Sequence, residues 1–207
     1  MSVRSFSSRA RKRAEAPSAA ALRVHPLTDG RWNDLVALFG DRGAYGGCWC
    51  MWWRLPRSSF AKQSGAGNRR ALRRLVRDGV PTGLLGYVGG EPVGWIAVGP
   101  RETLPTLERS RVLRRVDGAS VWSITCLFVA RAHRASGVAR QLITAAVEHV
   151  RERGGHLVEA YPTEPRGRTL APVSSYMGTP ALFARNGFRQ VARPSAAKTV
   201  MRREVTP

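Results

Sequence analysis

The sequence predicts one α/β domain, of the α+β kind, and three stretches lead to that prediction. A strand–loop–helix–strand unit extends over 120–161, a β-hairpin over 83–98, and a helix followed by two strands over 175–203. The chain has 207 residues, which is long enough to bury one proper core. We therefore expect a basic tail at 1–20 and a single domain at 21–207.

The tail is rich in Arg, Lys, Ser and Ala and has almost no apolar side chain. Such a composition cannot bury enough apolar surface to fold, so we expect residues 1–20 to be disordered. Two interpretations stay open for it. It is either an arm for nucleic acid or another anionic surface, or a solvated tail without a role.

The domain begins with a predicted strand at 22–27, and Thr28 or Asp29 can cap the helix that follows. A glycine-rich loop at 40–47 then leads into the sequence CWCMWWR at 48–54. Two cysteines one residue apart, without a neighbouring histidine, cannot supply a closed zinc site, so we predict no metal.

The three tryptophans of this sequence, Trp49, Trp52 and Trp53, allow two interpretations. Large rings beside thiols can form the wall of an acceptor pocket, or they can fill the core between helices. We take the tryptophans as candidate substrate-binding residues and keep core packing as the alternative.

Residues 68–78 place leucine and valine on one side and several arginines on the other, which predicts an amphipathic basic helix. Its arginines can touch RNA or an acidic partner, or form a solvated face. The hairpin over 83–98 follows, with Gly89 and Gly90 at its turn. A charged segment at 101–117 then predicts a loop and a short helix.

The unit at 120–161 carries the clearest chemistry. Val121 to Val129 contain no Gly, Pro or charge, which predicts a strand buried on both faces. A basic loop leads to Gly137, where a one-faced helix begins, and a further strand at 157–161 closes the unit. The first amides of a helix have no partner within it and its dipole is positive there, so this turn suits a pyrophosphate.

The turn sequence Arg134-Ala-Ser-Gly-Val-Ala139 resembles the acetyl-coenzyme A signature Arg/Gln-x-x-Gly-x-Gly/Ala of the GNAT N-acetyltransferase superfamily. The hairpin with its Val-Gly-Trp-Ile strand and the Gly187-Phe188 pair after a short helix are also similar to that family. The resemblance implies the GNAT fold, a mixed and mostly antiparallel sheet with flanking helices. Its central parallel strands splay apart and leave a V-shaped slot.

The resemblance also implies a cosubstrate, acetyl-CoA, and an amine acceptor. The pantetheine arm would pair with the fourth strand, and the pyrophosphate would lie on the turn. The coenzyme-binding residues implied are Leu127, Phe128, Val129, Arg134, Ala135, Ser136, Gly137, Val138, Ala139 and Arg140.

The catalytic residues depart from the family pattern. Many members have an acidic Tyr in the C-terminal helix, and the resemblance places Phe183 there, which has no proton to give. Tyr176 can supply the hydroxyl from another turn, and Glu159 and Tyr161 are candidates for the general base. For these three the alternative is a packing or surface role. Cys126 is a possible acyl nucleophile or a structural thiol.

Charge and composition bound the partners. The net charge of +20 favours polyanions, so a basic nucleic-acid-binding module is an alternative to the enzyme, and a catalytically silent coenzyme A sensor is another. Three cysteines without a disulfide pattern, no apolar run of membrane length and no secretory signal lead us to expect a cytoplasmic protein without membrane contact. We expect a monomer or a homodimer.

Overall fold

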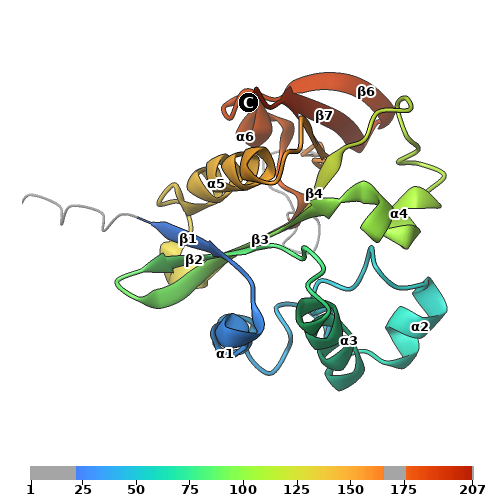
Figure 1. Cartoon of the computed structure of the whole chain (residues 1–207). Coiled ribbons are helices and arrows are strands. Elements are labelled where there is room, and N and C mark those ends of the chain that lie inside the picture. The colour runs from blue at the N-terminus through green and yellow to red at the C-terminus, as the bar shows by residue number, and fades with distance from the viewer. Residues whose placement is uncertain (1–21, 166–175, 207) are drawn as a thin grey trace, which may run out of the picture.

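A seven-stranded β-sheet forms the centre of the protein, as the computed structural model in Figure 1 shows. The structure describes residues 22–165 and 176–206, so the tail predicted at 1–20 lies outside the described residues. The strands follow the order β1-β2-β3-β4-β5-β7-β6, and β4 and β5 are the parallel pair among antiparallel neighbours. The predicted class, with a mixed and mostly antiparallel sheet, is confirmed.

The strands form where the sequence has short apolar or β-branched runs. They are β1 (Arg23–Pro26), β2 (Leu84–Val88), β3 (Glu91–Pro100), β4 (Trp122–Val129), β5 (Leu157–Ala160), β6 (Arg189–Ser195) and β7 (Lys198–Glu204). The predicted hairpin is β2 and β3, and Gly89 and Gly90 at its turn both have positive φ.

The helices are α1 (Trp32–Phe39), α2 (Arg57–Lys62), α3 (Ala66–Arg77), α4 (Pro105–Glu108), α5 (Val138–Glu152) and α6 (Pro180–Ala184). Three short 3-10 turns lie at Asp29–Arg31, Arg101–Thr103 and Arg131–His133. The basic helix predicted at 68–78 is α3, and the loop and short helix predicted at 101–117 contain α4.

Helices cover both faces of the sheet. In Figure 1, α5 and α6 lie above it, and α1 and α3 lie below. The apolar face of α5 packs on Leu84 and Ile96 in one core, whereas α1 and α3 enclose Leu85 and Trp95 in the other. The alternation of neighbouring strand residues between the two cores follows from the two-residue period of a strand.

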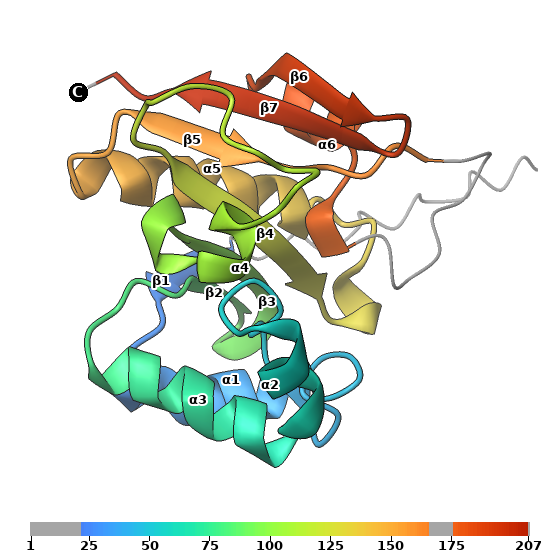
Figure 2. The same cartoon turned by 90° about the vertical axis from the view of Figure 1, so that its right-hand side faces the viewer.

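A third core lies beside the far end of the sheet and fixes the segment between β3 and β4. Leu104, Leu107 and Leu113 of that segment pack on Tyr161 and Val200. Figure 2 shows α4 and its loop lying against β4, with the helices α1, α2 and α3 below them.

Glycines in β2 and β3 allow α5 to approach the sheet closely. A Cβ atom at Gly94 would lie 2.9 Å from Leu142 Cδ1 and 3.1 Å from Val138 Cγ1, and one at Gly86 would lie 3.0 Å from Leu142 Cδ2. Leu142 is fully buried between the two glycines, so it has no room to withdraw.

We expect Gly94→Ala to destabilise the fold by about 1–3 kcal/mol, because overpacking forces side chains off their rotamers. Gly118→Ala is the matched control, since a Cβ atom there meets nothing within 4 Å. Urea unfolding of the two variants measures the difference. Equal stabilities would contradict the close packing of α5.

Strand β4 pairs with β5 over a short length. Its register with β5 is Trp122↔Val158, Ser123↔Glu159 and Ile124↔Ala160, and it extends no further. On its other edge, β4 stays paired with β3 as far as Val129. The pairing with β3 shifts between Ile124 and Cys126 and leaves Thr125 as the extra residue of a bulge. The parallel strands therefore separate from Thr125 onward.

Candidate active site

The separation of β4 from β5 leaves one edge of β4 without a strand partner in the described part of the chain. Leu127, Phe128 and Val129 lie on this stretch. Backbone amides and carbonyls at such an edge can hydrogen-bond an extended ligand as another strand would. The edge therefore suits the amide-containing arm that the sequence analysis expects at these residues.

The turn before α5 is open and positively charged. Gly137 is the N-cap residue with φ of 86° and ψ of −3°, and a Cβ atom there would meet nothing within 4 Å. Because α5 begins at Val138, the amides of Val138, Ala139 and Arg140 have no acceptor within the helix. Ala135 also has a left-handed φ, of 61°.

A guanidinium connects this turn with the open strand edge. Arg134 Nε donates to the Val129 carbonyl oxygen over 3.1 Å, and Ser136 Oγ donates to the His133 carbonyl oxygen over 2.6 Å. Arg134 and Arg140 are exposed, as is Ser136. The residues predicted to bind the coenzyme thus fall into two adjoining sets, the edge of β4 and the start of α5.

Tyr176 lies between the third core and the middle of β4. Like Trp53, it packs against that core from the border. Burial raises the pKa of its hydroxyl, the thiols of Cys126 and Cys48 raise that pKa further, and the Arg57 guanidinium opposes them. The hydroxyl therefore keeps its proton at neutral pH, beside the Cys126 position of β4.

Phe183 is a core residue next to the open stretch of β4. It is fully buried in α6 and packs edge-on against Phe188, with ring centroids 5.2 Å apart. It belongs to the core beneath α5 and α6. The ring therefore secures α6 to the sheet.

Glu159 and Tyr161, the candidate bases, lie in a buried polar cluster at the end of the sheet where β4 and β5 are still paired. Both are fully buried. The Tyr161 hydroxyl donates to Glu159 Oε1 over 2.7 Å and lies 2.7 Å from Ser123 Oγ. Burial, and then the Glu159 carboxylate, raise the pKa of Tyr161 far above its ordinary value. This geometry favours a structural role for both residues over proton transfer to an acceptor.

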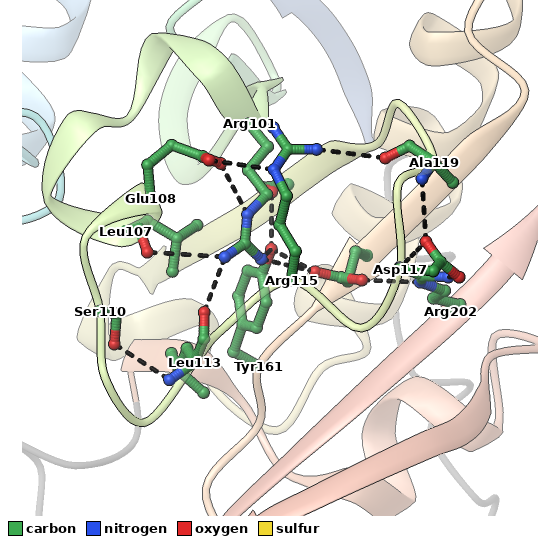
Figure 3. Close-up of polar contacts among 12 residues, drawn as sticks. Arg101, Leu107, Glu108, Ser110, Leu113, Arg115, Asp117, Ala119, Tyr161 and Arg202 are labelled. Atoms are coloured by element: carbon green, nitrogen blue, oxygen red, sulfur yellow. Dashed lines mark hydrogen bonds and ion pairs between the residues drawn. The ribbon is translucent and has the colours of Figure 1, made fainter.

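The centre of that cluster is Arg101, which the sequence analysis did not single out. Its side chain is completely buried, and Figure 3 shows it donating to the segment around it and to Tyr161. It donates to Glu159 and Tyr161 through Nη1, to Glu108 through Nε, and to the carbonyl oxygens of Leu107 and Leu113 through Nη2. Every nitrogen of the guanidinium has a partner, as a buried charge requires.

Two further arginines extend the cluster. Arg202 donates to Glu159 Oε2 over 2.6 Å and to Asp117, and Arg115 donates to Glu108 over 3.0 Å. Two acidic side chains of the segment between β3 and β4, Glu108 and Asp117, are thereby held by arginines (Figure 3).

The three candidate tryptophans have different positions. Trp49 is 2% exposed and stacks on Trp32, with centroids 6.1 Å apart, so it fills the core between α1 and α3. Trp52 lies under the guanidinium of Arg57, whose Cζ atom is 3.2 Å from the ring centroid. Trp53 lines a cavity, and its Nε1 atom is buried without a hydrogen-bond partner among the described residues.

The cavity at Trp53 has a volume of about 690 Å³, within the range of small-molecule sites. Its walls come from the start of α2, the segment after α4 and the β6–β7 turn. Its apolar lining is Trp53, Val112 and Leu113, and its cationic lining is Arg57, Arg109 and Lys198. Another cavity, of about 580 Å³, lies at the distant β1–β2 edge and includes His25 and Tyr87.

Cys50 and Cys126 pack against the core that contains Trp95. Trp95 Nε1 donates to Cys50 Sγ over 3.1 Å, and burial raises the pKa of Cys48 to about 11. All three cysteines are free. Within 22–165 and 176–206, no group of three His, Cys, Asp or Glu side chains is arranged to hold a metal ion.

Comparison with known proteins gives one family and a common fold. The family described as Acetyltransferase (GNAT) matches residues 49–170. No curated protein matches the chain.

Three solved structures illustrate the shared fold. A GNAT-family acetyltransferase from Listeria monocytogenes is 12% identical, with a TM-score of 0.54 over 88% of this chain and 94% of that one. An N-acetyltransferase from Staphylococcus aureus is 11% identical, with a TM-score of 0.52 over 90% of this chain and 100% of that one. A ribosomal-protein-alanine N-acetyltransferase from Brucella melitensis is 18% identical, with a TM-score of 0.51 over 88% of this chain and 99% of that one. At such identities the likeness concerns the fold alone.

Proposed function

Because this chain belongs to the acetyltransferase (GNAT) family and is therefore an acyltransferase, we propose that it moves an acetyl group from acetyl-CoA to an amine. The observation that carries the proposal is the open edge of β4 adjoining the unpaired amides at the start of α5. Acetyl-CoA would supply the acetyl group as a thioester. The protein would bind the coenzyme, position the amine and protonate the departing thiolate.

The residues at the two sets fit the coenzyme. Leu127, Phe128 and Val129 would hold its amide-containing arm through their backbone, as an added strand is held. The amides of Val138 to Arg140 would hold the pyrophosphate, where the helix dipole and the side chains of Arg134 and Arg140 favour negative charge. Ala135, Ser136 and Gly137 shape this turn.

The acceptor would enter from the cavity lined by Trp53. Trp53 and Tyr176 both pack against the third core, and Tyr176 has Arg57 of the cavity and Cys126 of β4 as electrostatic neighbours. We therefore propose that its hydroxyl lies between the cavity and the open strand edge. A phenol that keeps its proton at neutral pH can give it to the departing thiolate. We propose Tyr176 as this acid. The attacking amine loses its proton to solvent through the cavity, and Tyr176 regains a proton from solvent after the thiol has left.

We expect Tyr176→Phe to lower kcat roughly 100-fold with little change in the KM for acetyl-CoA, the lower end of what acid catalysis contributes. The raised pKa of Tyr176 means that its proton is retained as the pH rises to 10, its ordinary value. The wild-type rate should therefore show no alkaline loss from this group below pH 10. Steady-state thiol release, measured with Tyr45→Phe as an exposed control, tests both points. An unchanged kcat would remove Tyr176 from the mechanism.

Calorimetric titration with acetyl-CoA tests the proposed function directly, followed by thiol release across a panel of amines. Absence of binding would overturn the assignment. Binding without turnover would favour the second candidate, a coenzyme A sensor, which the phenylalanine at 183 keeps open.

We propose a cytoplasmic location. The three free cysteines support it, because thiols stay reduced in that compartment. No helix within the described residues is both long and apolar enough to cross a bilayer.

A further inference from the structure

The cavity beside Trp53 is positively charged and has no carboxylate in its lining. Arg57, Arg109 and Lys198 contribute the charges, and they come from three separate parts of the chain. Segments distant in sequence thus bring cations of one sign to one cavity of about 690 Å³.

These cations lack ion pairs with the acidic groups that the structure describes. Lys198 Nζ donates to Thr163 Oγ1 over 2.7 Å and contacts Met177 Sδ at 3.1 Å, both uncharged. Arg57 donates to a backbone oxygen, that of Trp52, and stacks on the Trp52 ring. Arg109 forms no salt bridge within the described ranges. Burial also lowers the pKa of Lys198, as expected for a cation without a counter-charge.

Two acids of the segment between β3 and β4 are held by other arginines. Glu108 is paired with Arg101 and Arg115, and Asp117 with Arg202. Glu164, which lies beside β7, accepts from Thr199 Oγ1 over 2.7 Å and does not line the cavity. The segment between β3 and β4 therefore directs the carboxylates of Glu108 and Asp117 into the buried cluster and presents Arg109 to the cavity. The result is a local excess of positive charge beside an apolar wall.

The cavity also adjoins the reacting end of the proposed site. Arg57 lines the cavity and is an electrostatic neighbour of the Tyr176 hydroxyl. The Nε1 atom of Trp53 is a buried donor for which the described chain offers no acceptor, and leaving it unpaired is costly. An acceptor with its amine near Tyr176 can thus place carboxylates among donors and cations.

We propose that the acceptor is an amine that carries carboxylate groups, held by Arg57, Arg109 and Lys198. The proposal rests on the proposed acetyl transfer and adds its substrate class. A carboxylate entering this cavity loses water and gains charge-assisted hydrogen bonds, whereas a cationic amine such as a polyamine is repelled. The charge selects the acceptor, and the coenzyme turn takes no part in that selection.

The test compares acceptors that differ only in charge. Three peptide amides, Ala-Glu-Glu, Ala-Gln-Gln and Ala-Arg-Arg, each offer one amine, the α-amine, and free glutamate against glutamine separates a small-molecule acceptor from a peptide. We expect kcat/KM to fall in the order acidic, neutral, basic. Arg109→Glu should lower kcat/KM for the acidic peptide about tenfold more than kcat/KM for the neutral peptide.

Arg111→Glu is the matched control, since it makes the same charge change at another exposed residue of the same segment, outside the cavity lining. It should keep the preference of the wild type, and acetyl-CoA affinity should be equal in all three proteins. Lys198→Met removes a charge without reversing it. It should therefore lower the ratio of kcat/KM for the acidic peptide to that for the neutral peptide by a smaller factor than Arg109→Glu does.

The outcomes separate the two proposals. Acetyl transfer with a neutral or basic preference, or equal effects of the substitutions at 109 and 111, would overturn the substrate class and leave the enzyme intact. If acetyl-CoA does not bind, the proposed function fails. Calorimetric titration of Ala-Glu-Glu into the full chain then tests whether the cavity binds an acidic ligand. Binding to the wild type that is lost in Arg109→Glu supports the acidic-ligand site, and absence of binding to the wild type refutes it.

Discussion

Gly137→Glu is expected to abolish acetyl-CoA binding at micromolar concentrations. The substitution adds a carboxylate where the amides of Val138 to Arg140 face outward and where a pyrophosphate would lie. Two unit charges about 4 Å apart repel by about 4 kcal/mol at an effective dielectric constant of about 20. That energy corresponds to about a thousandfold loss of affinity.

Gly154→Glu controls for the backbone. Gly154 follows the other end of α5, has a φ of 72°, and like Gly137 has nothing within 4 Å of an added Cβ atom. Both substitutions carry the same strain in the left-handed region, but only the one at Gly137 brings charge to the helix start. Calorimetry should show normal binding in Gly154→Glu. If the two variants bind alike, the pyrophosphate does not lie at the start of α5.

Arg101→Met is expected to destabilise the fold by about 3–5 kcal/mol, the usual cost of leaving one member of a buried ion pair alone. Glu159 would keep Arg202 and the Tyr161 hydroxyl but lose the guanidinium at Oε1, and the Leu113 carbonyl oxygen would lose the Arg101 donor. Because whole domains are stable by only about 5–15 kcal/mol, this is a large fraction. Urea unfolding measures it.

Arg115→Met is the control for this experiment. Arg115 also pairs with Glu108, but its side chain is 35% exposed, and such pairs contribute at most about 1 kcal/mol. A loss in Arg101→Met as small as in Arg115→Met would mean that the buried cluster contributes little to stability.

The pH dependence has a definite sign. Burial alone would raise the pKa of Glu108, but hydrogen bonds from Arg115 and Arg101 outweigh it, so the pKa lies below its ordinary 4.5. A carboxylate with a lowered pKa stabilises the fold above its unfolded pKa, and that stability is lost as the pH falls through the folded value. The difference between wild type and Arg101→Met should therefore narrow below about pH 4.5.

The sequence allows the fold and the coenzyme turn to be predicted because their signals are local. An apolar strand, a glycine with left-handed φ and a one-faced helix lie next to one another in the chain, and the fold keeps them so. The hairpin of β2 and β3 is equally local. Each signal depends on a period or a turn that a few residues define.

The Arg101 cluster could not be predicted in the same way. Arg101, Glu159 and Arg202 come from three distant parts of the chain, and in sequence the charged segment at 101–117 is indistinguishable from a solvated loop. The sequence indicates Glu159 and Tyr161 as candidate bases, but only the tertiary structure shows that the Arg101 guanidinium donates to both.

The tryptophans show the same limit. Trp49, Trp52 and Trp53 are almost adjacent, yet Trp49 is buried under α1 and α3 whereas Trp53 lines the cavity. Trp49 and Cys50 both adopt left-handed φ, of 46° and 53°, which turns the chain sharply between the two environments. Because non-glycine residues rarely adopt this conformation, residue preferences could not predict the turn at Trp49 and Cys50.

The segment between β3 and β4 is buried on one side and exposed on the other. Its stability comes from Arg101 and the leucines beneath it, while Arg109 and Val112, which line the cavity, are exposed. Substitutions at exposed positions usually change stability by less than about 0.5 kcal/mol. If the proposed site is right, the acceptor preference can be changed at Arg109 and Val112 without altering the sheet or the proposed coenzyme turn.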